Sequence, residues 1–331
     1  MATINSNTLS KQSPLRSGSY KTSTKHFFRS SKLFEAQITE TFDHLWPTIT
    51  ALKNLRWQVN GYYPCMETRD NVELTKKFVE NRDITVRPNL YRMCIELPWE
   101  EQEFHVAQNL LIQLFACYEA WCESILKEAH CNNIRDNAKK LQFPIRCGSC
   151  ISALSTAPNT SIVNAFYNTY INSINDASVA NIDNYLLVYR YFKEIRNNIA
   201  HTGGIIDAKV MTAYQDIARL SNNDIDVTEF PEHFTPILGA PIKISLRGIV
   251  GFAQILLKLV TVIDVELIKS NNADKYYLDA IRASMTCRIF DAPGRGKNEI
   301  FAAKLSKQSY FKKPSPGNTL YQLLQSNQIV R

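Results

Sequence analysis

Glycine and proline are scarce in this chain of 331 residues, which has 11 and 13 of them respectively. Their scarcity excludes a collagen-like or low-complexity protein, because such proteins depend on frequent Gly and Pro. Hydrophobic residues make up 45% of the chain, enough for one large core with accessory parts or for two modest domains. We therefore expect a soluble globular protein.

Long uninterrupted hydrophobic runs are also absent. No apolar stretch follows the early Lys and Arg residues, so we expect no secretory signal. The most apolar segment, 249–267, is interrupted by four polar residues: Gln254, Lys258, Asp264 and Glu266. A membrane span tolerates such residues poorly, so this segment is expected to be a buried helix and no membrane partner is expected. The eight cysteines are scattered, several of them in apolar helical stretches, which favours a reducing cytoplasm.

Several catalytic motifs are missing as well. The chain has no paired-His metal motif, no nucleophile elbow and no dinucleotide fingerprint. Cys147 and Cys150 form a CxxC pair downstream of His130 and Cys131, a set that could bind zinc. Because there is no second CxxC, we favour the alternative that these cysteines bind no metal.

Charge is unevenly distributed along the chain. The net charge is +7 overall, with +6 in residues 1–32 and +7 in 282–331, which leaves −6 for 33–281. Basic ends can attract nucleic acid by releasing counterions, although solvated tails are the simpler interpretation. We expect 1–32 to be a disordered basic leader and 273–331 to be a basic, peripheral C-terminal arm.

Residues 33–98 predict a small accessory region of mixed structure. From Phe34, apolar residues recur at helical spacing, and Pro47 is expected to kink or break that helix. Further on, hydrophobic residues alternate with polar ones at positions 91–97, which predicts a short strand.

The segment 99–272 predicts an antiparallel helical bundle, so the fold class is mainly α. A long helix is expected after Pro98, where an acidic first turn suits a helix N-terminus. Shorter helical patterns follow at 162–174 and 206–220, and a strongly apolar helix is expected over 246–267.

The helix expected over 183–201 carries the most informative residues. Its core stripe advances by three or four positions from Tyr185 to Ile199, and Gly203 and Gly204 provide a stop. At 100° per residue, His201 lies roughly 160° from the middle of this stripe and Arg196 roughly 60°. A buried structural histidine is therefore disfavoured, while an exposed histidine that caps helix carbonyls is an open alternative.

The spacing of Arg196 and His201 bears on mechanism. On one regular helix they diverge by about 140° and roughly 7.5 Å of rise, so a single helix aims them poorly at one phosphate. Two such helices related by a two-fold axis would bring an Arg and a His from each subunit into a shared cleft. Asn197 precedes His201 by one helical turn and could orient its imidazole.

The string RNNIAH at 196–201, late in a helix within a helical domain, resembles the signature of the HEPN superfamily (higher eukaryotes and prokaryotes nucleotide-binding). That signature is an Arg, an adjacent polar residue and a His after four to six intervening positions. The helix that contains Tyr118 to Trp121 resembles the first helix of such domains, and the helix near 246–269 resembles the last. The resemblance covers roughly 100–272.

The resemblance implies a metal-independent endoribonuclease that acts as a homodimer, without a cofactor, often as a toxin or phage-defence effector with a regulatory partner such as an antitoxin. Arg196 would bind the phosphate, His201 would be the acid–base residue, and Asn197 the polar neighbour. One subgroup has a Tyr two residues after the His as a site of modification; Gly203 occupies that position here. A non-catalytic nucleotide-binding or protein-interaction adaptor is the alternative function.

Three further residues are candidates near this pair. Glu119 lies in an otherwise apolar stretch and could pair with Arg196, although a solvent-facing position on an amphipathic helix is the simpler interpretation. Arg190 and Lys193 could contact the RNA backbone, against the alternative of plain surface residues. Together these residues predict cleavage through the RNA 2′-hydroxyl, giving a 2′,3′-cyclic phosphate and a 5′-hydroxyl.

Overall fold

The computed structural model describes residues 24–79, 88–174, 177–285, 290 and 296–330. Within these residues it is helical and contains only isolated β-bridges, which confirms the mainly α class. The strand predicted at 91–97 is wrong, because Arg92–Glu96 forms a wide helical turn. Arg56, on the first long helix, donates to two backbone carbonyls in this region, Met93 O (2.9 Å) and Leu97 O (2.7 Å). These carbonyls therefore have hydrogen-bond donors without a neighbouring β-strand.

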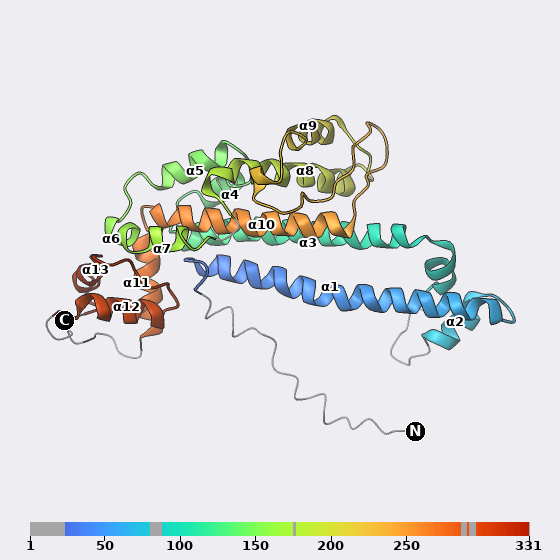
Figure 1. Cartoon of the computed structure of the whole chain (residues 1–331), viewed down its shortest axis with the longest axis horizontal. Helices are drawn as coiled ribbons and strands as arrows, with labels where there is room; N and C mark the ends of the chain where they lie inside the picture. The colour runs from blue at the N-terminus through green and yellow to red at the C-terminus, as the bar shows by residue number, and fades with distance from the viewer. Residues whose placement is uncertain (1–23, 80–87, 175–176, 286–289, 291–295, 331) are drawn as a thin grey trace, which may run out of the picture.

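Four long helices build the centre of the molecule (Figure 1). They are α1 (Arg29–Tyr62), α3 (Trp99–Glu128), α8 (Ile182–His201) and α10 (Leu246–Glu266). Helix α10 packs against the other three. Figure 1 shows α1 and α8 running in the opposite direction to α3 and α10.

Helix α10 is the most hydrophobic element of the bundle. Ser245 caps its start by accepting a hydrogen bond from the Gly248 amide (3.0 Å). By length and composition alone, Leu246–Lys269 would be long enough to cross a membrane. Within the protein, 67% of its most apolar 18-residue stretch is buried. Its apolar residues line the core on several sides, as expected for a helix with bundle neighbours around it.

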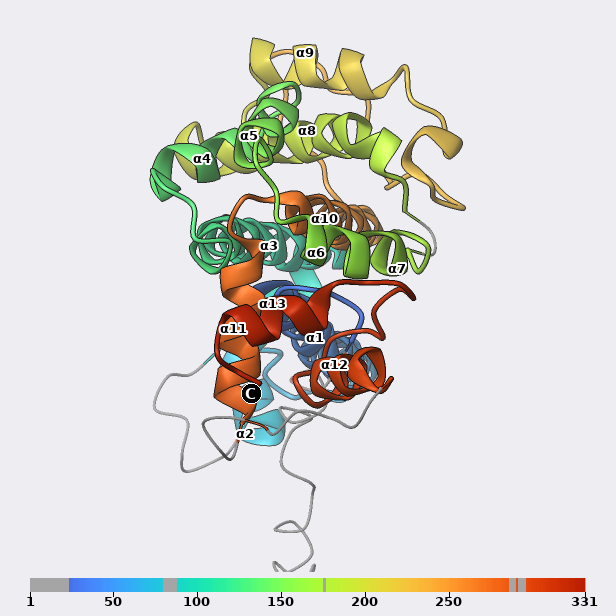
Figure 2. The same cartoon turned by 90° about the vertical axis from the view of Figure 1, so that its left-hand side faces the viewer.

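Shorter helices cover the bundle in layers. An end-on view shows α9 outermost, then the layer of α4, α5 and α8, then α3 and α10, with α1 beneath (Figure 2). The shorter helices are α2 (Asn71–Phe78), α4 (Ile134–Lys140), α5 (Arg146–Leu154), α6 (Thr160–Ile162), α7 (Asn168–Ile171), α9 (Ala208–Ile217), α11 (Ala273–Ser284), α12 (Asn298–Gln308) and α13 (Leu320–Ser326). A wide helical turn, Val163–Tyr167, joins α6 to α7.

The N-terminal part departs from the sequence-based expectation. Residues 1–23 of the predicted leader lie outside the described residues, but Phe27 and Phe28 are fully buried and α1 begins at Arg29. The leader therefore ends before residue 32. Helix α1 also continues through Pro47 as a single element, contrary to a break at that position. The end of α1, helix α2 and the wide helical turn near Cys94 form a separate small core, around Val59 and Leu74.

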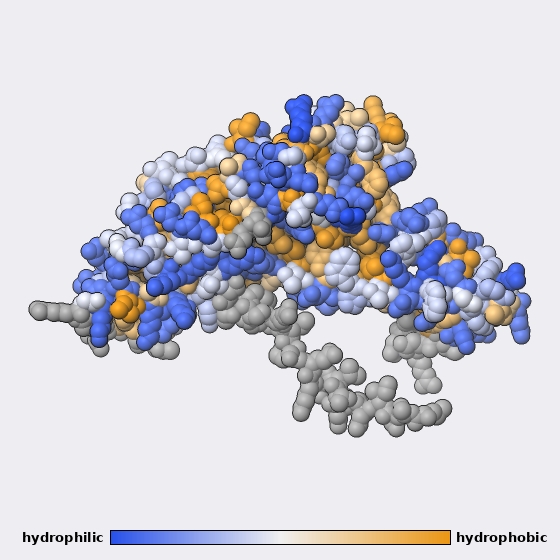
Figure 3. Space-filling model, in the orientation of Figure 1, coloured by the Kyte–Doolittle hydropathy of each residue, from blue (hydrophilic) through white to orange (hydrophobic). Residues whose placement is uncertain are grey.

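The C-terminal segment is also less peripheral than expected. Four buried residues of this segment belong to the same core as the four long helices: Tyr277 and Ile281 of α11, Leu324 of α13, and Phe311, which lies between α12 and α13. These residues extend the main core rather than lying on its surface. Figure 3 shows the hydrophobic surface of this view gathered in the middle of the molecule, while both ends are mainly hydrophilic.

Candidate active site at the end of helix α8

Helix α8 ends as the sequence predicts. Gly203 (φ 66°) and Gly204 (φ 79°) adopt the left-handed conformation that glycine accepts without strain. The carbonyl of Asn198 accepts hydrogen bonds from the amides of Thr202 (3.0 Å) and Gly204 (2.9 Å). The Asn198 side chain is buried and donates to Ile205 O (3.0 Å). Asn198 therefore fastens the helix end, a role that the motif alone does not reveal.

His201 is the last residue of α8 and is exposed. Within the described part of the chain its imidazole makes no hydrogen bond or ion pair, so it does not cap the helix carbonyls. Asn197, one turn earlier, is partly buried, and its side chain has no hydrogen-bond partner there either. The cap interpretation is thus not supported, and both side chains remain available to another molecule.

Arg196 is held in one orientation by helix α3. Its Nη2 donates to Glu119 Oε1 (2.6 Å), and its guanidinium lies over the ring of Phe115, 5.2 Å from the ring centroid. The Arg196 side chain is 20% exposed and that of Glu119 is 39% exposed. Glu119 thus both faces solvent and pairs with Arg196, which joins the two interpretations of this residue. The charge-assisted hydrogen bond to Glu119 and the cation–π contact with Phe115 together restrict the orientation of the guanidinium. The hydrogen bond to Glu119 uses one of its donors.

Lys193 shares the same acidic partner. Its ammonium is 3.9 Å from Glu119 Oε1, and it donates to Gln142 Oε1 (2.7 Å). It also lies over the ring of Phe143, 5.0 Å from the centroid. Burial lowers the pKa of Lys193, an effect that Glu119 partly opposes. Lys193 is therefore neither a plain surface residue nor an open phosphate contact.

Arg190 is partly buried, about three turns before the end of α8. Its Nε atom is buried and has no hydrogen-bond partner within the described residues. A buried guanidinium nitrogen without a partner is costly. Arg190 thus differs from the plain surface residue that the sequence favoured.

The structure brings the predicted residues together only in part. Arg196, Lys193 and Glu119 form one cluster between α8 and α3. His201 points away from Arg196, because on a helix the two residues diverge by about 140°. One chain therefore presents two half-sites.

The cysteines of the CxxC pair lie in α5 and are both buried. Burial raises the pKa of Cys147 and Cys150, which disfavours the thiolate that zinc requires. Among the residues that the structure describes, no three His, Cys, Asp or Glu side chains gather in a way that could hold a metal ion.

Two residues of the cluster were not predicted as site residues. Phe115 lies one helical turn before Glu119, so the i, i+4 spacing on α3 could have indicated that they share a face. Gln142 carries no such signal, because it reaches Lys193 across 51 residues of sequence.

No protein-family model, curated protein or solved structure matches this chain.

Proposed function

We propose that this chain is a metal-independent endoribonuclease in which Arg196 binds the scissile phosphate and His201 transfers protons. The observation that carries the proposal is the state of these two side chains. Arg196 is held by Glu119 and Phe115, and His201 is exposed without a partner among the described residues. A preorganised cation and an accessible imidazole are the two groups that RNA cleavage requires.

The reaction needs no nucleophile from the protein. The RNA 2′-hydroxyl attacks the adjacent phosphorus, its proton passes to a base, and the bond from phosphorus to the 5′-oxygen breaks. An imidazole accepts the first proton or, when protonated, gives one to the leaving oxygen. The Arg196 guanidinium neutralises the charge that grows on the phosphate.

A second copy of the chain completes the site in this proposal. Because the two half-sites of one chain diverge, Arg196 of one protomer would act with His201 of the other across a two-fold axis. The helical bundle would then be of the HEPN kind. In the cell such an enzyme would serve as an RNA-cleaving effector in the cytoplasm, for example in a toxin or defence system with a regulatory protein partner.

The first test is cleavage of total RNA by the purified protein in EDTA. We expect His201→Ala to abolish cleavage and Arg196→Ala to reduce it by about 100-fold to 1000-fold, the usual effect of losing a group that stabilises charge in the transition state. His44→Ala and Arg219→Ala are matched controls, because both residues are exposed and lie outside α8, His44 on α1 and Arg219 in the turn after α9. Full activity of His201→Ala would refute the assignment.

A mixing experiment tests the shared site separately. Protomers with Arg196→Ala lack the phosphate-binding group, and protomers with His201→Ala lack the imidazole. If the two groups act across the dimer, a mixture of the two inactive proteins regains part of the activity in mixed dimers. If both groups act within one chain, the mixture stays inactive.

An association module is the second candidate function. The observation that favours it is a set of large apolar side chains near the end of α8: Ile205, Ile237 and Leu238 are 42%, 68% and 64% exposed. Exposed apolar residues of this kind mark contact surfaces. Self-association that Leu238→Glu abolishes, with no RNA cleavage by the unchanged protein, would favour this function over the nuclease.

A further inference from the structure

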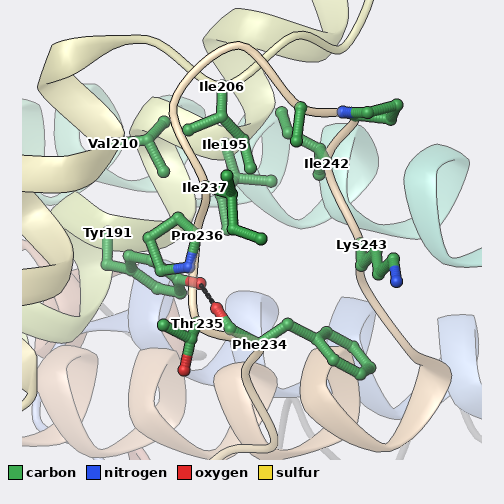
Figure 4. Close-up of a pocket in the computed structure, with 12 residues that line it drawn as sticks. Tyr191, Ile195, Ile206, Val210, Phe234, Thr235, Pro236, Ile237, Ile242 and Lys243 are labelled. Carbon is green, nitrogen blue, oxygen red and sulfur yellow. Dashed lines mark hydrogen bonds between the residues drawn. The ribbon is translucent and has the colours of Figure 1, made fainter.

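A pocket of about 280 Å³ lies beside helix α8 (Figure 4), and Arg196, Lys193 and Glu119 are not among its lining residues. It opens to solvent and is lined by α8, by the start of α9 with the segment before it, and by the loop at 234–243 that leads towards α10. Its lining residues are Tyr191, Ile195, Ile206, Val210, Phe234, Thr235, Pro236, Ile237, Ala240, Pro241, Ile242 and Lys243. The proposed nuclease chemistry uses none of them.

The walls of this pocket are apolar. Ile195, Ile206, Val210 and Ile242 are buried, and Figure 4 shows the side chains of Ile195, Ile206 and Ile237 close together. The Tyr191 hydroxyl donates to Phe234 O (3.3 Å), so it is already used within the wall. A ligand's apolar part would therefore displace water from an apolar cavity, which is favourable.

Backbone hydrogen bonds fix the walls in place. Ile206 N donates to Ala240 O (3.0 Å), Gly239 N to Ile206 O (3.0 Å), and Ile242 N to Gly204 O (2.8 Å). The segment after His201 and the loop at 234–243 thus hold each other as a short ladder. A cavity that exists before binding avoids much of the entropic cost of ordering its walls.

Lys243 gives the pocket its charge. It is the only charged residue in the lining, it is exposed, and it makes no ion pair with any described residue. In Figure 4 its ammonium points away from the apolar cluster, at the edge of the pocket. An anion at this edge would gain a partner without burying an unpaired charge.

We propose that this pocket binds a small carboxylate with an apolar body, such as a medium-chain fatty acid, with the chain among the isoleucines and the carboxylate at Lys243. The volume lies just below the usual range of ligand pockets, about 300–1,000 Å³, which favours a short chain. The site is independent of RNA cleavage.

Calorimetric titration of the full-length protein with octanoate tests this directly. We expect octanoate to bind about tenfold more tightly than hexanoate, because two more methylene groups are buried. Octylammonium, which has the same chain and the opposite charge, should bind more weakly than octanoate. Equal binding of octanoate and octylammonium, or no binding of either at millimolar concentrations, would overturn the proposal.

Two variants at one exposed position identify the charged partner. Lys243→Ala should weaken octanoate binding about threefold to fivefold, the effect of one exposed ion pair, and Lys243→Glu should reverse the preference towards octylammonium. Lys307→Ala, an exposed lysine on α12, is the matched control. Unchanged octanoate binding in Lys243→Ala would refute the role of Lys243. Self-association that Leu238→Glu abolishes and octanoate leaves unaffected would instead assign this surface to a protein contact and overturn the ligand proposal.

Discussion

The start of α1 and the end of α8 differ in whether their polar groups have hydrogen-bond partners within the protein. At the start of α1, Asp264 of α10 accepts hydrogen bonds from the amides of Phe27 (2.7 Å) and Phe28 (3.1 Å). Glu128 of α3 accepts from both the amide and the hydroxyl of Ser30, each at 2.9 Å. At the end of α8, His201 and Asn197 have no such partner among the described residues.

The difference separates polar residues that stabilise the fold from those that can serve a ligand. Buried polar groups need partners, so their hydrogen bonds contribute to stability and their loss is costly. Exposed side chains without partners contribute little to stability and can bind another molecule at no cost to the fold. The α1 start belongs to the first kind, and His201 at the α8 end to the second.

The largest expected effect is at the start of α1. Asp264→Ala removes the partner of two buried amides and a fully buried carboxylate near Lys32. We expect the free energy of unfolding to fall by about 3–5 kcal/mol, measured by urea denaturation. Asp43→Ala, an exposed residue of α1, is the control and should change it by less than about 0.5 kcal/mol. A small effect of Asp264→Ala would contradict the comparison.

A smaller effect is expected within the α8 end itself. Asn198→Ala removes the buried hydrogen bond to Ile205 O and should cost about 1–2 kcal/mol. Asn197→Ala should cost less than about 0.5 kcal/mol, because its side chain makes no hydrogen bond to the described residues. Thermal unfolding of the two variants compares neighbours of the same residue type. Equal losses would show that Asn197 is structural.

The third prediction concerns pH at the start of α1. Burial opposes the charge of Glu35, but the side chains of His26 and Lys25, 3.2 Å and 2.5 Å from its carboxylate oxygens, lower its pKa from 4.5 to about 2. An acid whose pKa is lowered by folding stabilises the protein above its ordinary pKa, and this stabilisation is lost as the pH falls from 4.5 towards 2.

We expect the loss to be about 1–2 kcal/mol, because the Glu35 side chain is partly exposed and solvent screens its partners. Urea denaturation at about pH 6 and about pH 3 measures it. Glu35→Gln should be less stable than the unchanged protein at the higher pH and should lose less on acidification. A parallel decline of both proteins would mean that Glu35 is not responsible.

The smallest expected effect is on stability at His201. Because its imidazole is exposed without a partner in the described chain, His201→Ala should change the unfolding free energy by less than about 0.5 kcal/mol. Differential scanning calorimetry on the same preparation used for RNA cleavage measures this. A large loss of stability would give His201 a structural role and would weaken its assignment as an acid–base residue.

Local sequence patterns predicted individual helices better than they predicted the contacts between helices. Helix α8 was expected over 183–201 and spans Ile182–His201, because its apolar spacing and glycine stop act within the segment itself. The alternating residues at 91–97 failed as a strand predictor, because Arg56 of α1 supplies the hydrogen bonds that a neighbouring strand would have given. Period-two patterns of this length do not distinguish a strand from a short helical turn packed on a helix.

The candidate site shows the same division. The exposure of His201 followed from its angular position on α8, which depends on sequence spacing alone. The hydrogen bond between Arg196 and Glu119 was one of two open interpretations, since 77 residues separate them. The sequence did not predict the burial of Phe27 and Phe28, because the composition of 1–32 is polar. The carboxylate of Asp264, which accepts hydrogen bonds from their amides, lies more than 200 residues away in the sequence.

By itself, the sequence determined the helical class, the boundaries of α8 and α10 and the outward direction of His201, because these depend on residues within one or two turns of each other. Only the tertiary structure decided the partners of Arg196, the burial of the chain before α1 and the pocket at Lys243. Those features arise where helices distant in sequence meet, and the packing that brings them together is not written in any single segment.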